Sequence, residues 1–81
     1  MQKIKQNEAI PIGANIRVIR RAKGIGQTEL VCKIQLTGVE ITRETLVKIE
    51  RGIQHLQATQ LRAIRDALGT TYDELLRPKN D

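Results

Sequence analysis

The segment from Gly26 to Gly52 constrains the fold of this chain more than any other. It contains two stretches in which apolar residues recur at helical spacing, and each has a start signal. Gly26 is the expected cap of the first stretch, with Glu29 as its reciprocal partner, and Thr42 is the expected cap of the second. A turn that contains Gly38 separates them. Two short amphipathic helices joined by such a turn form a helix-turn-helix unit.

The rest of the chain continues the helical pattern. Pro11 precedes a first helix that Gly24 ends, Gly69 ends a fourth, and Thr71 with Glu74 forms a capping box at the start of a fifth. No segment with the period of a strand stands out, so we predict an all-α domain. The expected helices cover about residues 12–23, 27–37, 43–51, 58–68 and 72–76. The apolar residues expected to face inward include Ile16, Leu30, Val31, Ile34, Leu36, Leu46, Ile49, Leu61, Ile64 and Leu68.

Positive charge is concentrated in the part of the chain that contains the helix-turn-helix unit. The whole chain has 14 Lys and Arg against 9 Asp and Glu, a formal net charge of +5. Residues 15–51 alone have eight basic and four acidic residues, which gives +4. Such a local excess suits a polyanionic partner such as nucleic acid. The alternative is an ordinary solvated basic surface.

The rare residue types argue against an enzyme or a metal site. Cys32 is the single cysteine and His55 the single histidine, so one chain cannot supply the four ligands of a structural zinc ion. Cys32 lies among apolar residues of the second helix, where we expect it to be buried rather than to act as a nucleophile. We expect no catalytic residues, no metal, no cofactor and no small-molecule substrate.

The sequence also predicts the overall organisation and location of the chain. Residues 1–10 are polar and lack the apolar run of a signal peptide, and no apolar stretch approaches the length needed to cross a membrane. We therefore expect a flexible N-terminal arm at residues 1–10 and a single domain at residues 11–77. The expected location is the cytoplasm.

Four pieces of the sequence, in this order, resemble the Cro/CI-type helix-turn-helix family, also called the XRE family, which includes phage repressors. The resemblance covers about residues 12–77. The matching positions are Asn15-Ile16-Arg17, Arg20, Gly24, Gln27 and Glu29-Leu30, then Thr42-Arg43, Thr45-Leu46 and Lys48-Ile49-Glu50-Arg51-Gly52, then Leu61, Ile64 and Ala67-Leu68-Gly69, and finally Asp73-Glu74-Leu75-Leu76. The resemblance implies a compact five-helix, lambda-repressor-like domain that binds specific sequences of double-stranded DNA. It also implies a transcriptional regulator, usually a repressor.

The resemblance further implies which residues contact DNA. It assigns base reading to the third helix, and phosphate contacts to the start of the second helix and to the loop after Gly52. It also implies an ion pair between Arg20 and Glu50 that ties the first helix to the third. The predicted DNA-binding residues are Gln27, Thr42, Arg43, Glu44, Thr45, Lys48, Gln54 and His55.

Helical geometry supports the same reading face independently. The residues opposite Leu46 and Ile49 face outward if those two pack inward, and they are Arg43, Glu44, Val47 and Lys48. Arginine can bind guanine through two hydrogen bonds, glutamate can accept one from cytosine, and lysine can reach guanine or a phosphate. The alternative is a solvated helix face on which Glu44 and Lys48 form an i, i+4 ion pair.

The connection between the second and third helices departs from the family pattern. Residues 35–40 lengthen it by roughly five residues relative to the tight turn that is usual in this motif. We expect the second helix to extend by a turn and to end at Gly38, with Thr37 and Gly38 in an exposed bend. Val39 and Ile41 should then pack against the core.

We infer the partners from the small size of the domain and from analogy with the family. One small module distinguishes few base pairs, so we expect a homodimer on an inverted repeat, with the fifth helix and Leu75-Leu76 as the candidate dimer surface. The alternative function is an antitoxin-like protein-protein module that uses the same fold to hold a second protein.

Overall fold

The computed structural model describes residues 3–7 and 9–79, and these are mostly helical. Two-residue strands β1 (Lys3–Ile4) and β2 (Leu56–Gln57) pair antiparallel. This pair is the only β-structure in the described residues, so the all-α prediction is confirmed. The helices are α1 (Ile12–Ala22), α2 (Gln27–Gln35), α3 (Arg43–Glu50), α4 (Ala58–Leu68) and α5 (Tyr72–Leu75).

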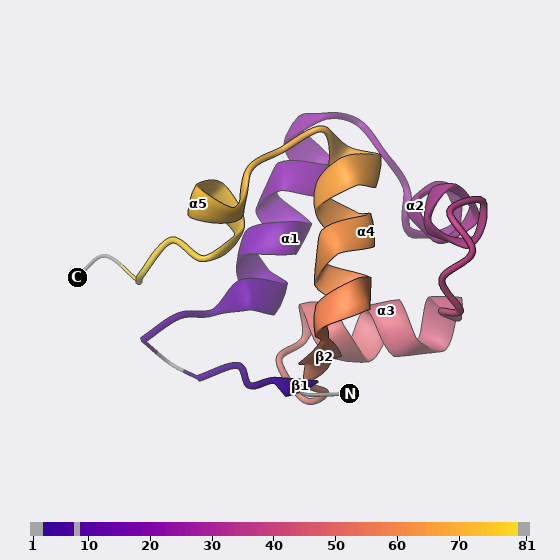
Figure 1. Cartoon of the computed structure of the whole chain (residues 1–81). Coiled ribbons are helices and arrows are strands. Elements are labelled where there is room, and N and C mark those ends of the chain that lie inside the picture. The colour runs from indigo at the N-terminus through magenta and orange to yellow at the C-terminus, as the bar shows by residue number, and fades with distance from the viewer. Residues whose placement is uncertain (1–2, 8, 80–81) are drawn as a thin grey trace.

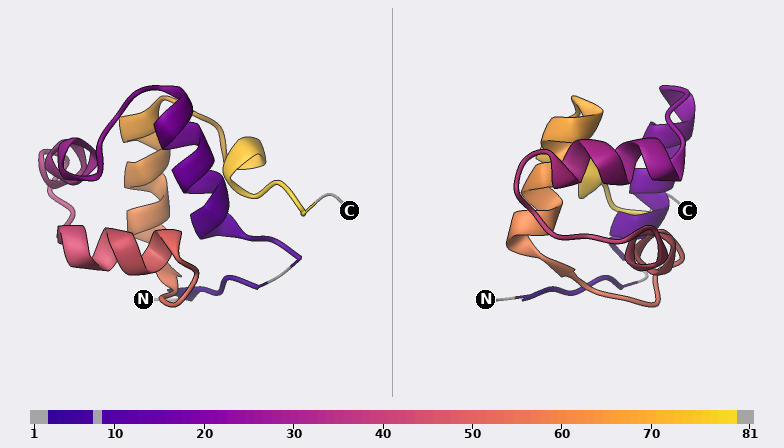
Figure 2. Two further views of the ribbon diagram at one scale, coloured as in Figure 1. Left: turned by 180° about the vertical axis from the view of Figure 1, so that it is seen from behind. Right: turned by 90° about the vertical axis from the view of Figure 1, so that its right-hand side faces the viewer.

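The helices surround one core. α1 and α4 stand side by side, and α3 crosses near one end of both (Figure 1). α2 packs on α3 and α4, while α5 packs on α1 at the opposite side of the molecule, as the views from behind and from the side show (Figure 2). Among the residues that the structure describes, no helix is long and apolar enough to span a membrane.

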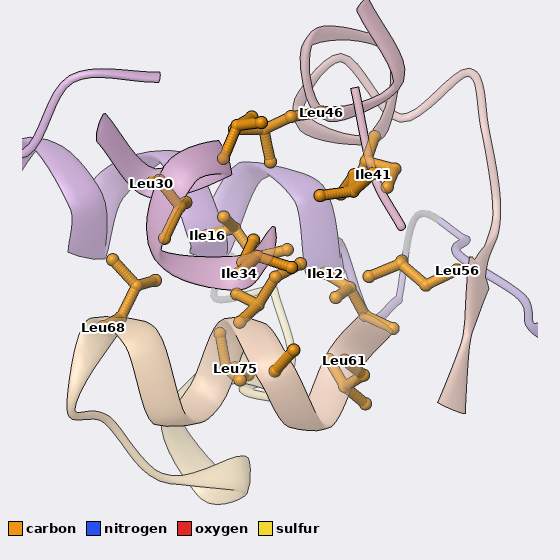
Figure 3. Packing of buried hydrophobic residues seen from close by; sticks show 14 residues of the cluster. Ile12, Ile16, Leu30, Ile34, Ile41, Leu46, Leu56, Leu61, Leu68 and Leu75 are labelled. Atoms are coloured by element: carbon orange, nitrogen blue, oxygen red, sulfur yellow. The ribbon is translucent and has the colours of Figure 1, made fainter. Parts of the chain in front are cut away.

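Every helix contributes side chains to the core. Ile16 and Ile34 lie near its centre, and both are completely buried (Figure 3). Leu75 of α5 is buried as well, so its side chain cannot form part of a dimer surface while the domain stays folded. The buried apolar residues are Ile12, Ile16, Leu30, Val31, Ile34, Ile41, Leu46, Ile49, Leu56, Leu61, Ala63, Ile64, Leu68 and Leu75.

Local signals set most of the helix ends as predicted. The hydroxyl oxygen of Thr42 accepts a hydrogen bond from the Thr45 N–H at 3.1 Å, and that of Thr71 accepts one from the Glu74 N–H at 3.2 Å. Gly69 ends α4 in a left-handed conformation with φ +64°, which favours glycine because other residues are strained there.

Four predictions for the second helix are wrong, including the inward-facing position of Leu36. Glu29 makes no capping hydrogen bond at the start of α2, and its carboxylate lies 3.9 Å from the Lys33 ammonium. Cys32 is exposed, since the inward side of α2 is set by Leu30 and a residue two positions later points to the opposite side. The helix ends at Gln35 rather than Gly38, and Leu36 beyond its end is 88% exposed.

The connection between α2 and α3 folds back on the domain. The Thr37 hydroxyl donates to the Ile34 carbonyl oxygen at 2.6 Å, and the Gln35 side chain donates to the Ile41 carbonyl oxygen at 2.9 Å. Gly38 completes the exposed bend with φ +90°. As predicted, Ile41 is buried and Val39 packs against the core. The position of α3 is therefore fixed by an anchor at Ile41.

The N-terminal segment contacts the domain through its described residues. Lys3 pairs with Gln57 and Ile4 with Leu56. The Gln6 side chain accepts a hydrogen bond from the Gly13 N–H at 2.7 Å and donates to the carbonyl oxygens of Ile49 and Gln54 at 3.0 and 2.9 Å. A single amide thus joins the start of α1, the end of α3 and the loop that follows. The flexibility of residues 1–10 stays a prediction, and no pattern in the sequence indicated these contacts.

We expect Gln6→Ala to lower the free energy of unfolding by about 2 kcal/mol, because it removes three hydrogen bonds of about 1 kcal/mol each and water replaces part of them. The Gly13 N–H belongs to the first turn of α1 and has no partner within the helix, so it depends on this side chain. Urea denaturation measures the change. Lys5→Ala is the control, because Lys5 is exposed on the same segment. Equal effects of the two substitutions would contradict the assigned role of Gln6.

Helices α1 and α3 meet at a point where only glycine fits. Gly13 is buried, and a Cβ atom at this position would overlap the main-chain carbonyl group of Ile49. The two nearest atoms are backbone, so they cannot move aside as a flexible side chain would. This close contact holds the end of α3 against the start of α1.

Candidate nucleic-acid interface

The predicted reading face of α3 is exposed. Arg43, Glu44 and Lys48 are all exposed, while Leu46 and Ile49 on the opposite side are completely buried. The Lys48 ammonium lies 3.3 Å from the Glu44 carboxylate, which is the i, i+4 pair that the sequence allowed. Arg43 has no hydrogen bond or ion pair within the described residues, so its guanidinium is available to a ligand.

Thr42 and Thr45 form the start of this helix. Besides accepting from the Thr45 N–H, the Thr42 hydroxyl donates to the Thr45 hydroxyl oxygen at 3.0 Å. Thr42 is exposed and Thr45 is half-buried. Their hydroxyl groups therefore stabilise the N-terminal end of α3, from which Arg43 and Glu44 project.

The predicted ion pair between α1 and α3 is confirmed. Arg20 donates from Nε and Nη2 to the two oxygens of Glu50 at 2.7 and 2.9 Å, and its Nη1 donates to the Ile25 carbonyl oxygen. The two side chains are only 9% and 2% exposed. The hydrogen bonds to Glu50 raise the pKa of Arg20 against the opposing effect of burial. This bidentate pair fixes α3 against α1.

Gln27 at the start of α2 forms a hydrogen bond with Glu50 of the same ion pair. Its amide nitrogen donates to a Glu50 carboxylate oxygen at 3.2 Å, and the residue is half-buried. One N–H of this amide group is thereby engaged, which leaves the second N–H for another acceptor. Glu50 thus orients the side chain that the resemblance assigned to the DNA backbone.

Gln54 and His55 lie in the loop that follows α3. The Gln54 carbonyl oxygen accepts from the Gln6 side chain, and the His55 Nδ1 accepts from the Gln6 main-chain N–H at 3.1 Å. His55 is exposed and Gln54 is half-buried. The predicted site residues therefore come from the start of α2, from α3 and from a loop that the N-terminal segment holds in place.

Three exposed arginines beside this surface were not among the predicted site residues. Arg17 and Arg21 of α1 and Arg51 after α3 border an open hollow of about 500 Å³ that Gln27 and Val47 also line. A sequence signal was present, because basic residues at 17, 20 and 21 cluster on one side of a helix. The cluster of basic residues did not indicate that the C-terminal end of α3 borders the same hollow.

The described residues hold no group of three or more His, Cys, Asp or Glu side chains that could bind a metal ion. Cys32 and His55 lie on different elements, and no interaction joins them in the part of the chain that the structure covers.

No protein-family model and no curated protein matches the sequence, but solved structures match the fold. The restriction-modification controller protein C.AhdI from Aeromonas hydrophila is 24% identical, with a TM-score of 0.71 over 82% of this chain and 92% of that protein. The clp gene regulator ClgR from Corynebacterium glutamicum is 23% identical, with a TM-score of 0.75 over 90% of this chain and 72% of that one. The hypothetical transcription factor NHTF from Neisseria is 23% identical, with a TM-score of 0.74 over 96% and 85% of the two chains. The chain therefore has the compact, five-helix, lambda-repressor-like fold that these proteins share and that the sequence predicted.

Proposed function

We propose that this chain is a non-enzymatic transcriptional regulator that binds specific sequences of double-stranded DNA through α3. The observation that carries the proposal is the exposed face of α3, where Arg43, Glu44 and Lys48 project from a helix whose other face is buried. These side chains have the hydrogen-bonding groups that read base edges in the major groove. The solved structures of similar fold include a controller protein, a gene regulator and a hypothetical transcription factor, which supports the same function.

The proposal also covers the regulatory effect, the location and the oligomeric state of the chain. The chain acts as a repressor in the cytoplasm and binds an inverted repeat as a homodimer, since two copies together distinguish more base pairs than one. The exposed parts of α5, together with the half-buried Leu76, form the dimer surface. Selection of bound sequences from a random duplex library tests this arrangement, because a homodimer should recover a palindrome.

Arg43→Ala tests the reading face. We expect it to weaken binding to the selected duplex by about 1–3 kcal/mol and to relax the preference at one base position. Gln27→Ala should weaken binding to the selected and a scrambled duplex by similar factors, because the proposed contact of its second N–H is with the DNA backbone and not with a base. Affinity for both duplexes is measured at one fixed salt concentration, since phosphate contacts depend strongly on salt.

Arg62→Ala is the matched control, because Arg62 is an exposed arginine of α4 outside the predicted site. An equal loss on both duplexes after Arg43→Ala would make Arg43 a phosphate contact and contradict the reading face. A salt titration tests the alternative protein-protein module. A regulator should lose log affinity for duplex DNA linearly with log salt concentration, whereas no duplex binding at low salt would favour the alternative.

A further inference from the structure

The hollow between α1 and the end of α3 has the composition of an anion site. Four of its lining residues are arginines and one is a glutamate, which gives a net formal charge of +3. The glutamate does not offset the exposed arginines, because both Glu50 oxygens already accept from Arg20 and one also accepts from Gln27. The lining residues are Arg17, Arg20, Arg21, Gln27, Val47, Glu50 and Arg51.

No described residue acts as a counter-ion for the three arginines at the edge of the hollow. Arg17, Arg21 and Arg51 are exposed, and none of them makes a side-chain hydrogen bond or an ion pair with any described residue. Arg17 and Arg21 are one helical turn apart on α1, and Arg51 faces them from the end of α3. Like charges held around one hollow raise its positive potential, so it attracts an anion.

The donors present suit a phosphate group. Arginine presents a planar fork that forms paired hydrogen bonds with phosphate oxygens. A phosphodiester shares one negative charge between two non-bridging oxygens, which can accept from several arginines approaching from different directions. The free N–H of Gln27 adds a neutral donor, which the bond to Glu50 holds at the wall of the hollow.

The position of the hollow identifies the source of the phosphate. Val47 lines the hollow and also lies on the partly exposed side of α3, one helical turn after Arg43 of the reading face. A duplex that receives the reading face of α3 must therefore pass its backbone close to Arg51 and Gln27. We propose that this hollow binds one phosphodiester group of the DNA backbone and so sets the depth and direction at which α3 enters the groove. The inference rests on the proposed function and adds Arg17, Arg21 and Arg51 to its site.

Charge-neutral variants of the three arginines test the proposal. We expect Arg21→Gln and Arg51→Gln each to weaken binding to the selected duplex about tenfold, as for a hydrogen bond to a charged group. The slope of log affinity against log salt should become shallower by at most about 0.9, the amount for the complete loss of one phosphate contact. Because the arginines share one phosphate, the double variant should lose less than the product of the two single effects. Arg62→Gln, an exposed arginine away from the hollow, is the control for loss of one charge.

A chemical change in the DNA identifies the contacted group. A set of duplexes, each with one phosphate replaced by a neutral methylphosphonate, is measured with the wild type and with Arg51→Gln. Neutralising one position should weaken the variant less than it weakens the wild type, because the variant has already lost one of the contacts to that phosphate. Thermal unfolding shows that each variant is folded before its affinity is compared.

The outcomes separate this inference from the function on which it rests. If the wild type does not distinguish the selected duplex from a scrambled one, the proposed function fails. A second outcome is that the wild type distinguishes the two duplexes, but the arginine variants have the same salt dependence of affinity as Arg62→Gln. If, in addition, every methylphosphonate duplex affects the wild type and Arg51→Gln equally, only the assignment of the hollow is wrong. A further outcome would also overturn the proposal. Inorganic phosphate would stabilise the wild type but not Arg21→Gln, while Arg21→Gln would bind DNA as the wild type does. The hollow would then bind a free anion and not the DNA backbone.

Discussion

Replacing Glu50 with alanine is expected to lower the free energy of unfolding by about 3–5 kcal/mol, because it leaves the buried Arg20 guanidinium without its counter-ion. The Glu50 side chain is only 2% exposed, and its oxygens accept from three nitrogen atoms. A domain of this size has a total stability of only about 4–12 kcal/mol, so the variant should be visibly unstable in urea denaturation.

The exposed pair on α3 supplies the control for this experiment. Glu44→Ala removes the carboxylate that faces Lys48, but the Glu44 side chain is 79% exposed and the pair is screened by water. We expect a change of at most about 0.5 kcal/mol. A loss below about 1 kcal/mol for Glu50→Ala would mean that the Arg20–Glu50 pair behaves like this surface pair, which would contradict its structural role.

Gly13→Ala is the second substitution with a large expected effect. The added methyl group would overlap the Ile49 carbonyl group, so α1 and α3 must move apart. We expect a loss of about 3 kcal/mol, at the upper end for overpacked cores, because the obstructing atoms are main chain. The gain in helix propensity, about 1 kcal/mol, offsets part of the strain and is included in this figure. Thermal and urea unfolding measure the net change.

Gly26→Ala is the matched control for the added methyl group. Nothing lies within 4 Å of a Cβ at this position, and its φ of −77° is accessible to alanine. Its cost should stay below about 1 kcal/mol, the value of a weakened helix cap. If Gly13→Ala were as mild as Gly26→Ala, the close contact between the two helices would not limit stability.

The helices could be predicted from the sequence because their end signals are local. Gly24, Gly52 and Gly69 adopt the positive φ that follows a helix, and Thr42 and Thr71 accept the hydrogen bonds expected of caps. The exposed face of α3 followed in the same way from helical spacing. Whether its residues bind DNA stays a prediction.

Features that depend on distant contacts were harder to predict. The Arg20–Glu50 pair joins residues 30 positions apart, and only the resemblance indicated it. The early end of α2 reflects the competing bonds of Thr37 and Gln35 with main-chain oxygens, which sequence periodicity does not report. The arginine-lined hollow needs α1 and the end of α3 to face one another, and no pattern within either helix contains that information.

The anchored connection between α2 and α3 makes this region suitable for engineering. Because Ile41 is buried and Gln35 holds its carbonyl oxygen, the orientation of α3 does not depend on how many residues the chain uses to reach that anchor. Val39 of the segment from Leu36 to Glu40 packs against the core, so the part whose length can change is the exposed bend at Thr37 and Gly38. A fluorescent label or a short peptide tag inserted there would report on the domain from a point next to α3 while leaving the contacts that position the helix in place.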